Sequence, residues 1–198
     1  MGFTRAELEA CRGRTVDDLV GPGLRLLFVG INPSLWTAAT GAHFARPGNR
    51  FYAALHLAAL HLAGITARVF DASSGMTDRD RAELVARGVG ITNLVRRATA
   101  RADELTVKEL RAGGRALREF VVRHRPRVVA VAGITAYRQA FGEPGAAAGR
   151  QPDSFEGAVL WVVPNPSGLN AHETPQSLGT AYRAAAVAAG VVVPPSSS

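Results

Sequence analysis

The stretch Leu26-Leu27-Phe28-Val29-Gly30-Ile31-Asn32-Pro33-Ser34 decides the fold. A short apolar run ends in a glycine, and an uncharged asparagine then stands immediately before a proline. The run is typical of a buried strand, and Gly30 and Pro33 turn the chain at its carboxyl end. Ligands of α/β sheets bind at that edge. The pattern therefore places Asn32, which has no useful acid–base pKa, where a catalytic residue is expected.

Three later segments repeat this short, aliphatic pattern. With the first, the predicted strands span residues 24–29, 89–94, 127–132 and 158–163. Continuous apolar runs, unlike alternating ones, are typical of parallel strands covered on both faces. Because helical segments separate the strands, we expect an α/β fold. Its form is a three-layer α/β/α sandwich around a mostly parallel sheet of four to five strands, with right-handed crossovers.

Three helices are predicted from their start signals. One spans residues 49–62, with apolar residues on or near one face. A second runs from the capping box formed by Thr106 and Glu109 to about residue 123. A third begins at Thr174 and Pro175, an N-cap followed by proline at the first helical position, and continues to about residue 189.

Length and composition bound the class of protein. A chain of 198 residues with 47% hydrophobic side chains can fill one core, so we expect a single domain over residues 1–190 and a flexible tail over 191–198. No apolar run is long enough to span a bilayer, and residues 1–12 lack the apolar centre of a signal peptide. We therefore expect a cytoplasmic, bacterial-type protein without membrane contact.

Metal and disulfide chemistry are not expected. Cys11 is the only cysteine, which excludes an internal disulfide and a cysteine-ligated zinc or iron–sulfur site within one chain. The five histidines do not fall into a recognised ligand spacing. The sequence thus predicts a protein with no metal and no cofactor.

The net charge of +7 and the pI of about 10.9 come almost entirely from arginine, since Lys108 is the only lysine. Such an excess indicates an anionic partner, most commonly nucleic acid. The alternative is a solvated basic surface in a protein whose genome favours arginine codons. Charge alone does not separate these two interpretations.

Two loops at the expected carboxyl edge of the sheet could carry chemistry. The first follows Val29 and combines an aromatic residue, Phe44, with Arg46 and Arg50, which suits a nucleobase and its phosphates. The second follows Val163, repeats the Asn-Pro-Ser turn and carries Leu169, an apolar side chain that could wedge between stacked bases. Each loop also has a structural interpretation, in which the apolar residues pack in the core and the arginines are solvated.

Five collinear motifs between residues 23 and 185 resemble those of the mismatch-specific uracil-DNA glycosylases, the family that includes thymine-DNA glycosylase. They are Gly30-Ile31-Asn32-Pro33, the segment from Phe44 to Phe51, Gly90-Ile91-Thr92-Asn93-Leu94-Val95, Glu109-Leu110-Arg111-Ala112-Gly113-Gly114 and Asn165-Pro166-Ser167-Gly168-Leu169. The resemblance implies hydrolysis of the N-glycosidic bond of uracil, with thymine or other damaged bases as further candidates, mispaired with guanine in double-stranded DNA.

The resemblance also implies roles for single residues. Asn32 would align the water, Phe44 would stack on the flipped base, and Ser167 would hold a phosphate. Gly168 and Leu169 would fill the vacated stack. The expected site residues are, for catalysis, Asn32 and Asn93; for the base, Gly30, Ile31, Phe44, Asn49 and Asn165; and for DNA, Ser34, Arg46, Ser167, Gly168, Leu169 and Asn170.

Three positions bear on how closely this chain follows the family pattern at the site. Ser34 stands where the family usually has glycine or alanine, and Asn170 stands where a basic residue commonly follows the wedge. Asn93 is a candidate second positioning residue for the water or backbone. Because the amide of Asn32 cannot accept a proton as a carboxylate would, we expect a slow enzyme limited to good leaving groups. No lysine lies near the motifs, so we expect no Schiff-base lyase activity.

Several alternatives stay open on the sequence. One is a glycosylase for deaminated purines, and another is a catalytically weak module that binds mismatches or damage. A small-molecule nucleotide enzyme is disfavoured because no phosphate-binding loop with a lysine follows the first strand. In the preferred interpretation the protein is a monomer whose partner is duplex DNA with a mismatched or damaged base.

Overall fold

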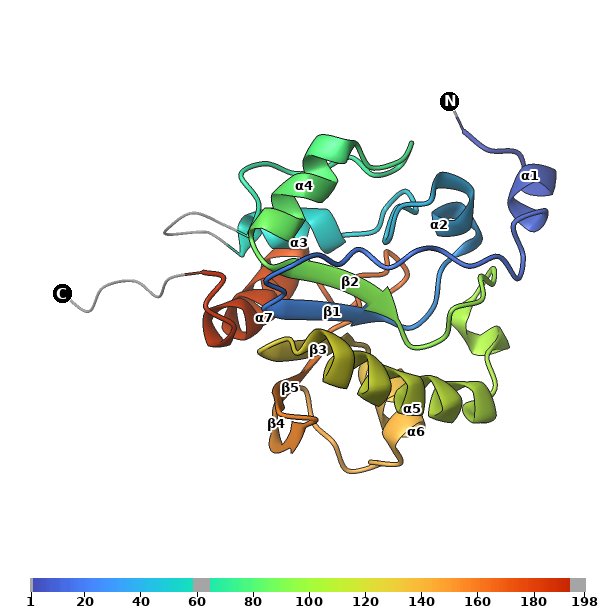
Figure 1. Cartoon of the computed structure of the whole chain (residues 1–198). Coiled ribbons are helices and arrows are strands. Elements are labelled where there is room, and N and C mark those ends of the chain that lie inside the picture. The colour runs from blue at the N-terminus through green and yellow to red at the C-terminus, as the bar shows by residue number, and fades with distance from the viewer. Residues whose placement is uncertain (1, 59–64, 193–198) are drawn as a thin grey trace.

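A five-stranded sheet forms the centre of the computed structural model, which describes residues 2–58 and 65–192. The strands lie in the order β2-β1-β3-β5-β4, and only β4 runs antiparallel to its neighbour. Helices cover both faces, as Figure 1 shows, so the expected three-layer, mostly parallel α/β/α fold is confirmed. The strands are β1 (Leu26–Gly30), β2 (Val89–Asn93), β3 (Val128–Ala132), β4 (Gly149–Phe155) and β5 (Ala158–Val163).

The helices flank the sheet in two layers. On one side lie α3, α4 and α7, and on the other lie α5 and α6 (Figure 1). Their bounds are α1 (Arg5–Glu9), α2 (Leu35–Thr40), α3 (Phe51–Leu57), α4 (Asp78–Ala86), α5 (Val107–His124), α6 (Ile134–Phe141) and α7 (Pro175–Ala188), with a 3-10 turn over Ala102–Glu104.

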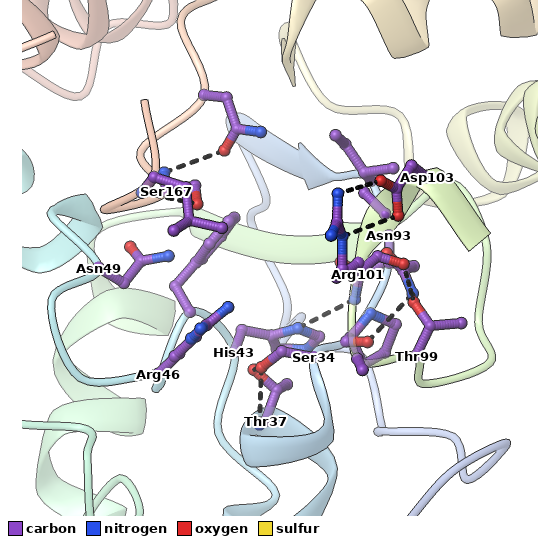
Figure 2. A pocket seen from close by; sticks show the side chains of 18 of the residues that line it. Ser34, Thr37, His43, Arg46, Asn49, Asn93, Thr99, Arg101, Asp103 and Ser167 are labelled. Carbon is purple, nitrogen blue, oxygen red and sulfur yellow. Dashed lines mark hydrogen bonds and ion pairs between the residues drawn. The ribbon is translucent and has the colours of Figure 1, made fainter. Parts of the chain in front are cut away.

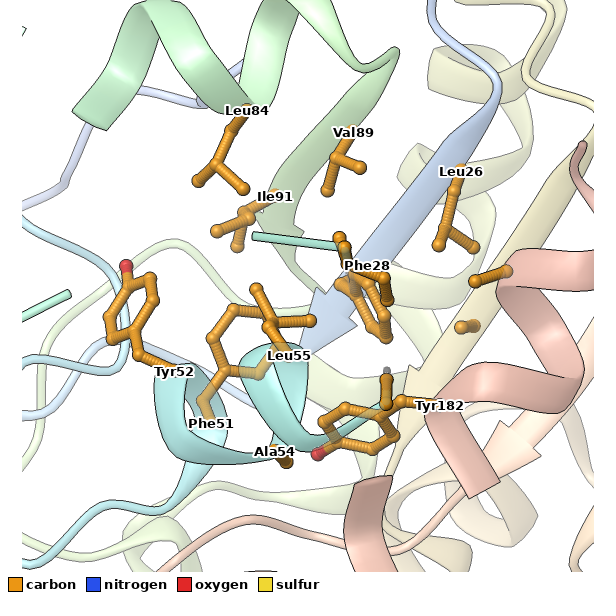
Figure 3. Packing of buried hydrophobic residues seen from close by; sticks show 14 of the residues in the cluster. Leu26, Phe28, Phe51, Tyr52, Ala54, Leu55, Leu84, Val89, Ile91 and Tyr182 are labelled. Atoms are coloured by element: carbon orange, nitrogen blue, oxygen red, sulfur yellow. The ribbon is translucent and has the colours of Figure 1, made fainter. Parts of the chain in front are cut away.

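The apolar run of β1 explains why the sheet is covered on both sides. Leu26 and Phe28 face the layer of α3 and α7, where Phe28 meets Phe51 and Tyr182 edge-on or tilted at ring distances of 5.2 and 5.1 Å (Figure 3). Leu27 and Val29 face the opposite layer, against α5 and α6. Since successive side chains of a strand point to opposite faces, a run that is apolar at every position requires two cores.

The four predicted strands are confirmed within two residues at each end, and the fifth was missed. Strand β4 contains Arg150, Pro152 and Asp153, a polar composition without a β pattern. It lies at the edge of the sheet, where polar residues and proline are tolerated because one side of the strand carries no partner.

The capping signals predicted two helices well. Thr106 and Glu109 form the predicted capping box of α5, and Thr174 caps α7 with Pro175 at its first position. The helix predicted over residues 49–62 begins at Phe51, and the part of it beyond residue 58 lies outside the described residues. Helices α1, α2, α4 and α6 were not predicted; each has nine residues or fewer, too few for a clear helical period.

The packed chain reaches beyond the predicted boundary at residue 190. The N–H of Val191 donates to the Ala186 carbonyl at 2.9 Å, and Val192 is buried against the α3–α7 core. Residues 193–198 of the predicted tail lie outside the described residues. In the described part of the chain, no helix has the length and apolar character needed to cross a membrane.

Two adjacent glycines let α5 approach its neighbours closely. A Cβ at Gly113 would lie 2.2 Å from the carbonyl oxygen of Leu94, and one at Gly114 would lie 2.9 Å from that of Ala140. Any side chain at Gly113 would therefore displace the segment that follows β2. This close contact fixes the loop that carries the residues after Asn93, at the carboxyl edge of the sheet.

Candidate active site

A cavity of about 440 Å³ lies at the carboxyl edge of the sheet, between the loops that follow β1, β2 and β5 (Figure 2). The wall contains every site residue expected from the sequence except Gly30 and Gly168. It also contains polar residues that sequence reasoning did not identify, namely Thr37, His43, Thr99, Arg101 and Asp103. The topology brings these loops together because the carboxyl ends of β1, β2 and β5 share one edge.

The Asn32 amide is held in one orientation by its nitrogen. Nδ2 donates to the carbonyl oxygens of Pro33 and Arg97, both at 3.1 Å, and to Thr99 Oγ1 at 2.7 Å. The Thr99 hydroxyl gives its own proton to the Arg101 carbonyl at 2.7 Å, so it must accept from Asn32. Asn32 Oδ1 accepts no hydrogen bond from the described residues. An unpaired carbonyl oxygen therefore stands at the cavity wall, able to accept from a water.

The acceptors around Asn32 are themselves fixed. Arg97 pairs with Glu109 of the α5 capping box, with Nε and Oε1 2.5 Å apart. The Arg97 guanidinium and the Thr106 cap lower the pKa of Glu109 to about 2, so this carboxylate stays charged at neutral pH. The Thr99 N–H donates to the Pro33 carbonyl at 3.2 Å, which joins the loops after β1 and β2. Asn32 is thus oriented by α5 through Arg97.

Asn93, the last residue of β2, contacts a buried histidine. Its Nδ2 lies 3.2 Å from His43 Nδ1, and His43 Nε2 lies 2.9 Å from the Asp17 carbonyl oxygen. Burial lowers the pKa of His43, which is 3% exposed, so its imidazole is neutral at pH 7. Asn93 Oδ1 accepts no hydrogen bond from the described residues. The two candidate asparagines are therefore anchored separately, Asn32 on the loop after β2 and Asn93 on His43.

Gly30 lies beneath the cavity rather than in its wall. A Cβ at this position would lie 2.5 Å from Asn93 Oδ1 and 3.3 Å from Phe44 Cζ. The Phe44 ring stacks on Phe51 at a centroid distance of 4.0 Å, which leaves its other face for the cavity. Glycine at position 30 thus allows an amide oxygen and an aromatic edge to lie side by side at the floor.

The two arginines of the Phe44 loop have different roles. Arg46 is exposed at the cavity wall, and its guanidinium forms no hydrogen bond or ion pair with the described residues, so this group is free to meet a phosphate. Arg50 instead donates to the carbonyl oxygens of Gly168, Asn170 and Glu173. The Arg50 guanidinium therefore holds the loop after β5, whereas a phosphate contact stays a prediction for Arg46.

That loop presents an apolar tip. Asn165 Oδ1 accepts from the Ser167 N–H at 3.0 Å, and Asn170 Nδ2 donates to the Asn165 carbonyl at 3.2 Å. Leu169 is 74% exposed, more than any other large hydrophobic residue of the described chain. The alternative in which Leu169 anchors the loop to the core is therefore excluded. A Cβ at Gly168 would lie 2.6 Å from the Gly48 carbonyl, so glycine is needed for the tip to pack on the Phe44 loop.

Two expected contact residues have structural roles as well. Ser34 caps α2, accepting from the Thr37 N–H at 3.1 Å and donating to Thr37 Oγ1 at 3.1 Å. Asn49 Oδ1 accepts from the Phe51 N–H at 2.9 Å at the start of α3. Both side chains reach the cavity wall, and Figure 2 shows them with Arg46 and Ser167 around it.

The residues that sequence reasoning missed carry little local signal. His43 stands immediately before the motif that begins at Phe44, but its partners lie 26 and 50 residues away. Thr99 belongs to no motif, and its role depends on Asn32, 67 residues earlier. Within residues 2–58 and 65–192, no group of three or more His, Cys, Asp or Glu side chains is placed to hold a metal ion.

Two comparisons with known proteins bear on the family and the fold of this chain. The family model of the Uracil DNA glycosylase superfamily matches residues 18–188, most of the chain. Among solved structures, the fold is similar to a solution NMR structure of a Methanosarcina acetivorans protein provisionally described as a uracil DNA glycosylase. The TM-score is 0.56 at 14% sequence identity, and the match covers 87% of this chain and 96% of that one.

Proposed function

The chain belongs to the uracil DNA glycosylase superfamily, and on that premise we propose that it removes uracil mispaired with guanine from duplex DNA by hydrolysis. The observation that carries the proposal is the Asn32 amide. Its nitrogen is held by three acceptors, and its oxygen is left free at a cavity that also presents an aromatic face. A single fixed acceptor suits a water that attacks an already electrophilic carbon.

The base would enter the cavity by flipping out of the duplex. Its glycosidic carbon is inaccessible inside the helix, and extrusion costs less for a mismatched base. The free face of Phe44 would stack on the flipped base. Asn93 Oδ1 lies beside the edge of the Phe44 ring, above Gly30, and so would meet the edge of a base stacked there. We therefore assign Asn93 to the base and Asn32 to the water.

Bond cleavage would depend on the leaving group. The sugar passes through an oxocarbenium-like state while uracil departs as an anion through N1. Backbone N–H groups near Ile31 and Phe44 would stabilise the developing charge on the base oxygens. The Asn32 oxygen orients the water but cannot take its proton, which predicts slow turnover and a preference for good leaving groups.

Recognition of the mismatch would involve the exposed tip. Leu169 would fill the space left by the flipped base, and Arg46 and Ser167 would contact phosphates beside it. With Asn170 after Leu169, the tip carries no positive charge of its own. None of the described residues in the cavity wall is a lysine, and the product is therefore an abasic site without strand cleavage by the enzyme.

A panel of duplexes tests the proposal. Uracil, thymine, ethenocytosine and hypoxanthine are each placed opposite guanine, with hypoxanthine also opposite thymine. Base release under single-turnover conditions is read as strand breaks after alkali. We expect the fastest release for uracil opposite guanine and no breaks without alkali. Faster release of hypoxanthine would indicate a glycosylase for deaminated purines, and tight binding without release from any duplex would indicate a damage-binding module.

A further inference from the structure

His43 lies in the cavity wall, is almost fully buried, and touches the one amide that we assign to the base. We propose that His43 is a positioning residue: it fixes which end of the Asn93 amide faces the cavity, and so makes the site select bases with a ring N–H over bases with a bare ring nitrogen. The inference rests on the proposed function. It identifies Asn93 Oδ1 as the group that distinguishes uracil, which has an N3–H, from cytosine, which does not.

The imidazole is held in one tautomer by its surroundings. The Asp17 carbonyl oxygen, 2.9 Å from Nε2, can only accept, so Nε2 carries the proton. In the neutral ring Nδ1 is then a bare acceptor, and it lies 3.2 Å from Asn93 Nδ2. His43 as a whole is 3% exposed, and this burial lowers the pKa of the imidazole and so favours the neutral form.

This tautomer determines the polarity of the Asn93 amide. Because Nδ1 accepts, the amide nitrogen must point to His43, and the amide oxygen must point the other way. Oδ1 accordingly lies over Gly30, beside the Phe44 ring edge. The opposite rotamer would place two acceptors face to face in a buried site, an unfavourable arrangement in the low dielectric of the interior.

The consequence is selection at the base edge. Uracil and thymine carry a proton on ring nitrogen N3, which can donate to Asn93 Oδ1. Cytosine has a lone pair on N3, which the same oxygen repels. A flipped cytosine is the most dangerous competitor, since it also pairs with guanine throughout undamaged DNA. An amide of fixed polarity rejects it through an unpaired buried acceptor.

Contacts from other elements keep His43 in place. The Tyr52 hydroxyl of α3 donates to the His43 main-chain carbonyl at 2.8 Å. Asp17 approaches from the segment before β1. Tyr52 therefore supports the same residue without touching its ring, which makes it a matched control.

The test compares single-turnover release of uracil and of 5-fluorocytosine, each opposite guanine. In 5-fluorocytosine the ring nitrogen N3 carries a lone pair in place of the N3–H, so it cannot donate to Asn93, and the fluorine makes the base a better leaving group. The ratio of the two rates is measured in the wild type, His43→Leu, Tyr52→Phe and Asn93→Ala. Differences in intrinsic reactivity between the two bases cancel when the ratios of two variants are compared.

We expect the wild-type ratio to exceed that of Asn93→Ala by about ten- to a hundred-fold, as for loss of one buried hydrogen bond. His43→Leu should bring the ratio close to that of Asn93→Ala, whereas Tyr52→Phe should keep the wild-type ratio even where its rates fall. A merely structural role of His43 would lower both rates together and leave the ratio unchanged, which would overturn the inference. Failure of the wild type to release uracil at all would instead overturn the proposed function.

A second measurement does not depend on the folding of a variant. Nitrogen-15 NMR of the wild type at pH 7.5 reports the tautomer of each histidine. We expect the His43 ring to carry its proton on Nε2. A proton on Nδ1 would force the Asn93 amide to turn its nitrogen toward the cavity, and would overturn the inference directly.

Discussion

Replacing Asn32 with alanine tests the proposed chemistry and the geometry that supports it. The substitution removes the free oxygen at the cavity wall and the amide nitrogen that donates to Pro33, Arg97 and Thr99. The first loss concerns catalysis and the second concerns stability, so the two effects can be measured separately.

The structure sets the size of each effect. Thr99 is 1% exposed, so its hydroxyl oxygen would lose a donor that water cannot easily replace. Leaving one or two buried acceptors unsatisfied costs about 1–3 kcal/mol of unfolding free energy. At about 2–4 °C per kcal/mol for a chain of this size, the melting temperature should fall by several degrees and leave a folded protein. Loss of water alignment should lower the single-turnover rate by at least about 10²-fold.

The assay follows uracil release from a G·U duplex, affinity for the same duplex by fluorescence anisotropy, and thermal unfolding. Thr99→Val is the matched control, because it removes one acceptor of the Asn32 amide but leaves the two carbonyl contacts. We expect Thr99→Val to lose similar stability but to stay within about ten-fold of the wild-type rate, and Asn32→Ala to bind normally without cleaving. A rate for Asn32→Ala within ten-fold of wild type, or equal losses of affinity and rate, would refute the water-positioning role.

Three further predictions concern the rim and the buried histidine. Leu169→Ala should leave the melting temperature unchanged, since the side chain is 74% exposed, but should weaken G·U duplex affinity and lower the rate; unchanged affinity would argue against a wedge. Arg50→Lys should lower the rate and the melting temperature, because a lysine cannot reproduce a fork that donates to three carbonyls; a wild-type rate would show that the loop is held by other contacts. Since the pKa of His43 is lowered in the folded state, the unfolded state binds more protons below about pH 6.5, so stability should be full above that pH and fall on acidification. Urea unfolding at several pH values measures this loss of stability, which should be smaller in His43→Leu than in the wild type. Equal dependence of the unfolding free energy on pH in the two proteins would contradict a lowered pKa of His43.

The sequence predicted the fold and the three converging loops because both depend on local signals. Continuous apolar runs marked four strands, and Asn-Pro turns marked the carboxyl ends of two of them, β1 and β5. Asn32 and Leu169 follow strand ends closely in the chain, and Phe44 lies on the same connection as Asn32, beyond the short helix α2, so the topology brought all three to one cavity. The polar edge strand β4 was missed because it buries one face only in part and shows no β pattern.

The partners of the site residues could not be read from the sequence. The residues around Arg50 in the sequence are typical of a phosphate-binding loop. Only the folded chain shows that its guanidinium donates to carbonyls of residues more than a hundred positions later. His43 resembles any buried histidine until its ring is seen between Asp17 and Asn93. Such contacts join segments far apart in the chain, and no spacing rule connects them.

The residues around position 32 also favour an amide over a carboxylate, apart from the proposed role of Asn32 in orienting the water. A carboxylate there would face the Pro33 and Arg97 carbonyls and the Thr99 hydroxyl, whose proton is already given to Arg101. All three are acceptors, so an aspartate would be repelled where an asparagine is held, and its pKa would be raised, which disfavours the charged form that acts as a base. The scaffold therefore selects the weaker catalytic group. A faster enzyme with this fold would need a carboxylic acid at position 32 and also a hydrogen-bond donor where the Thr99 hydroxyl now accepts.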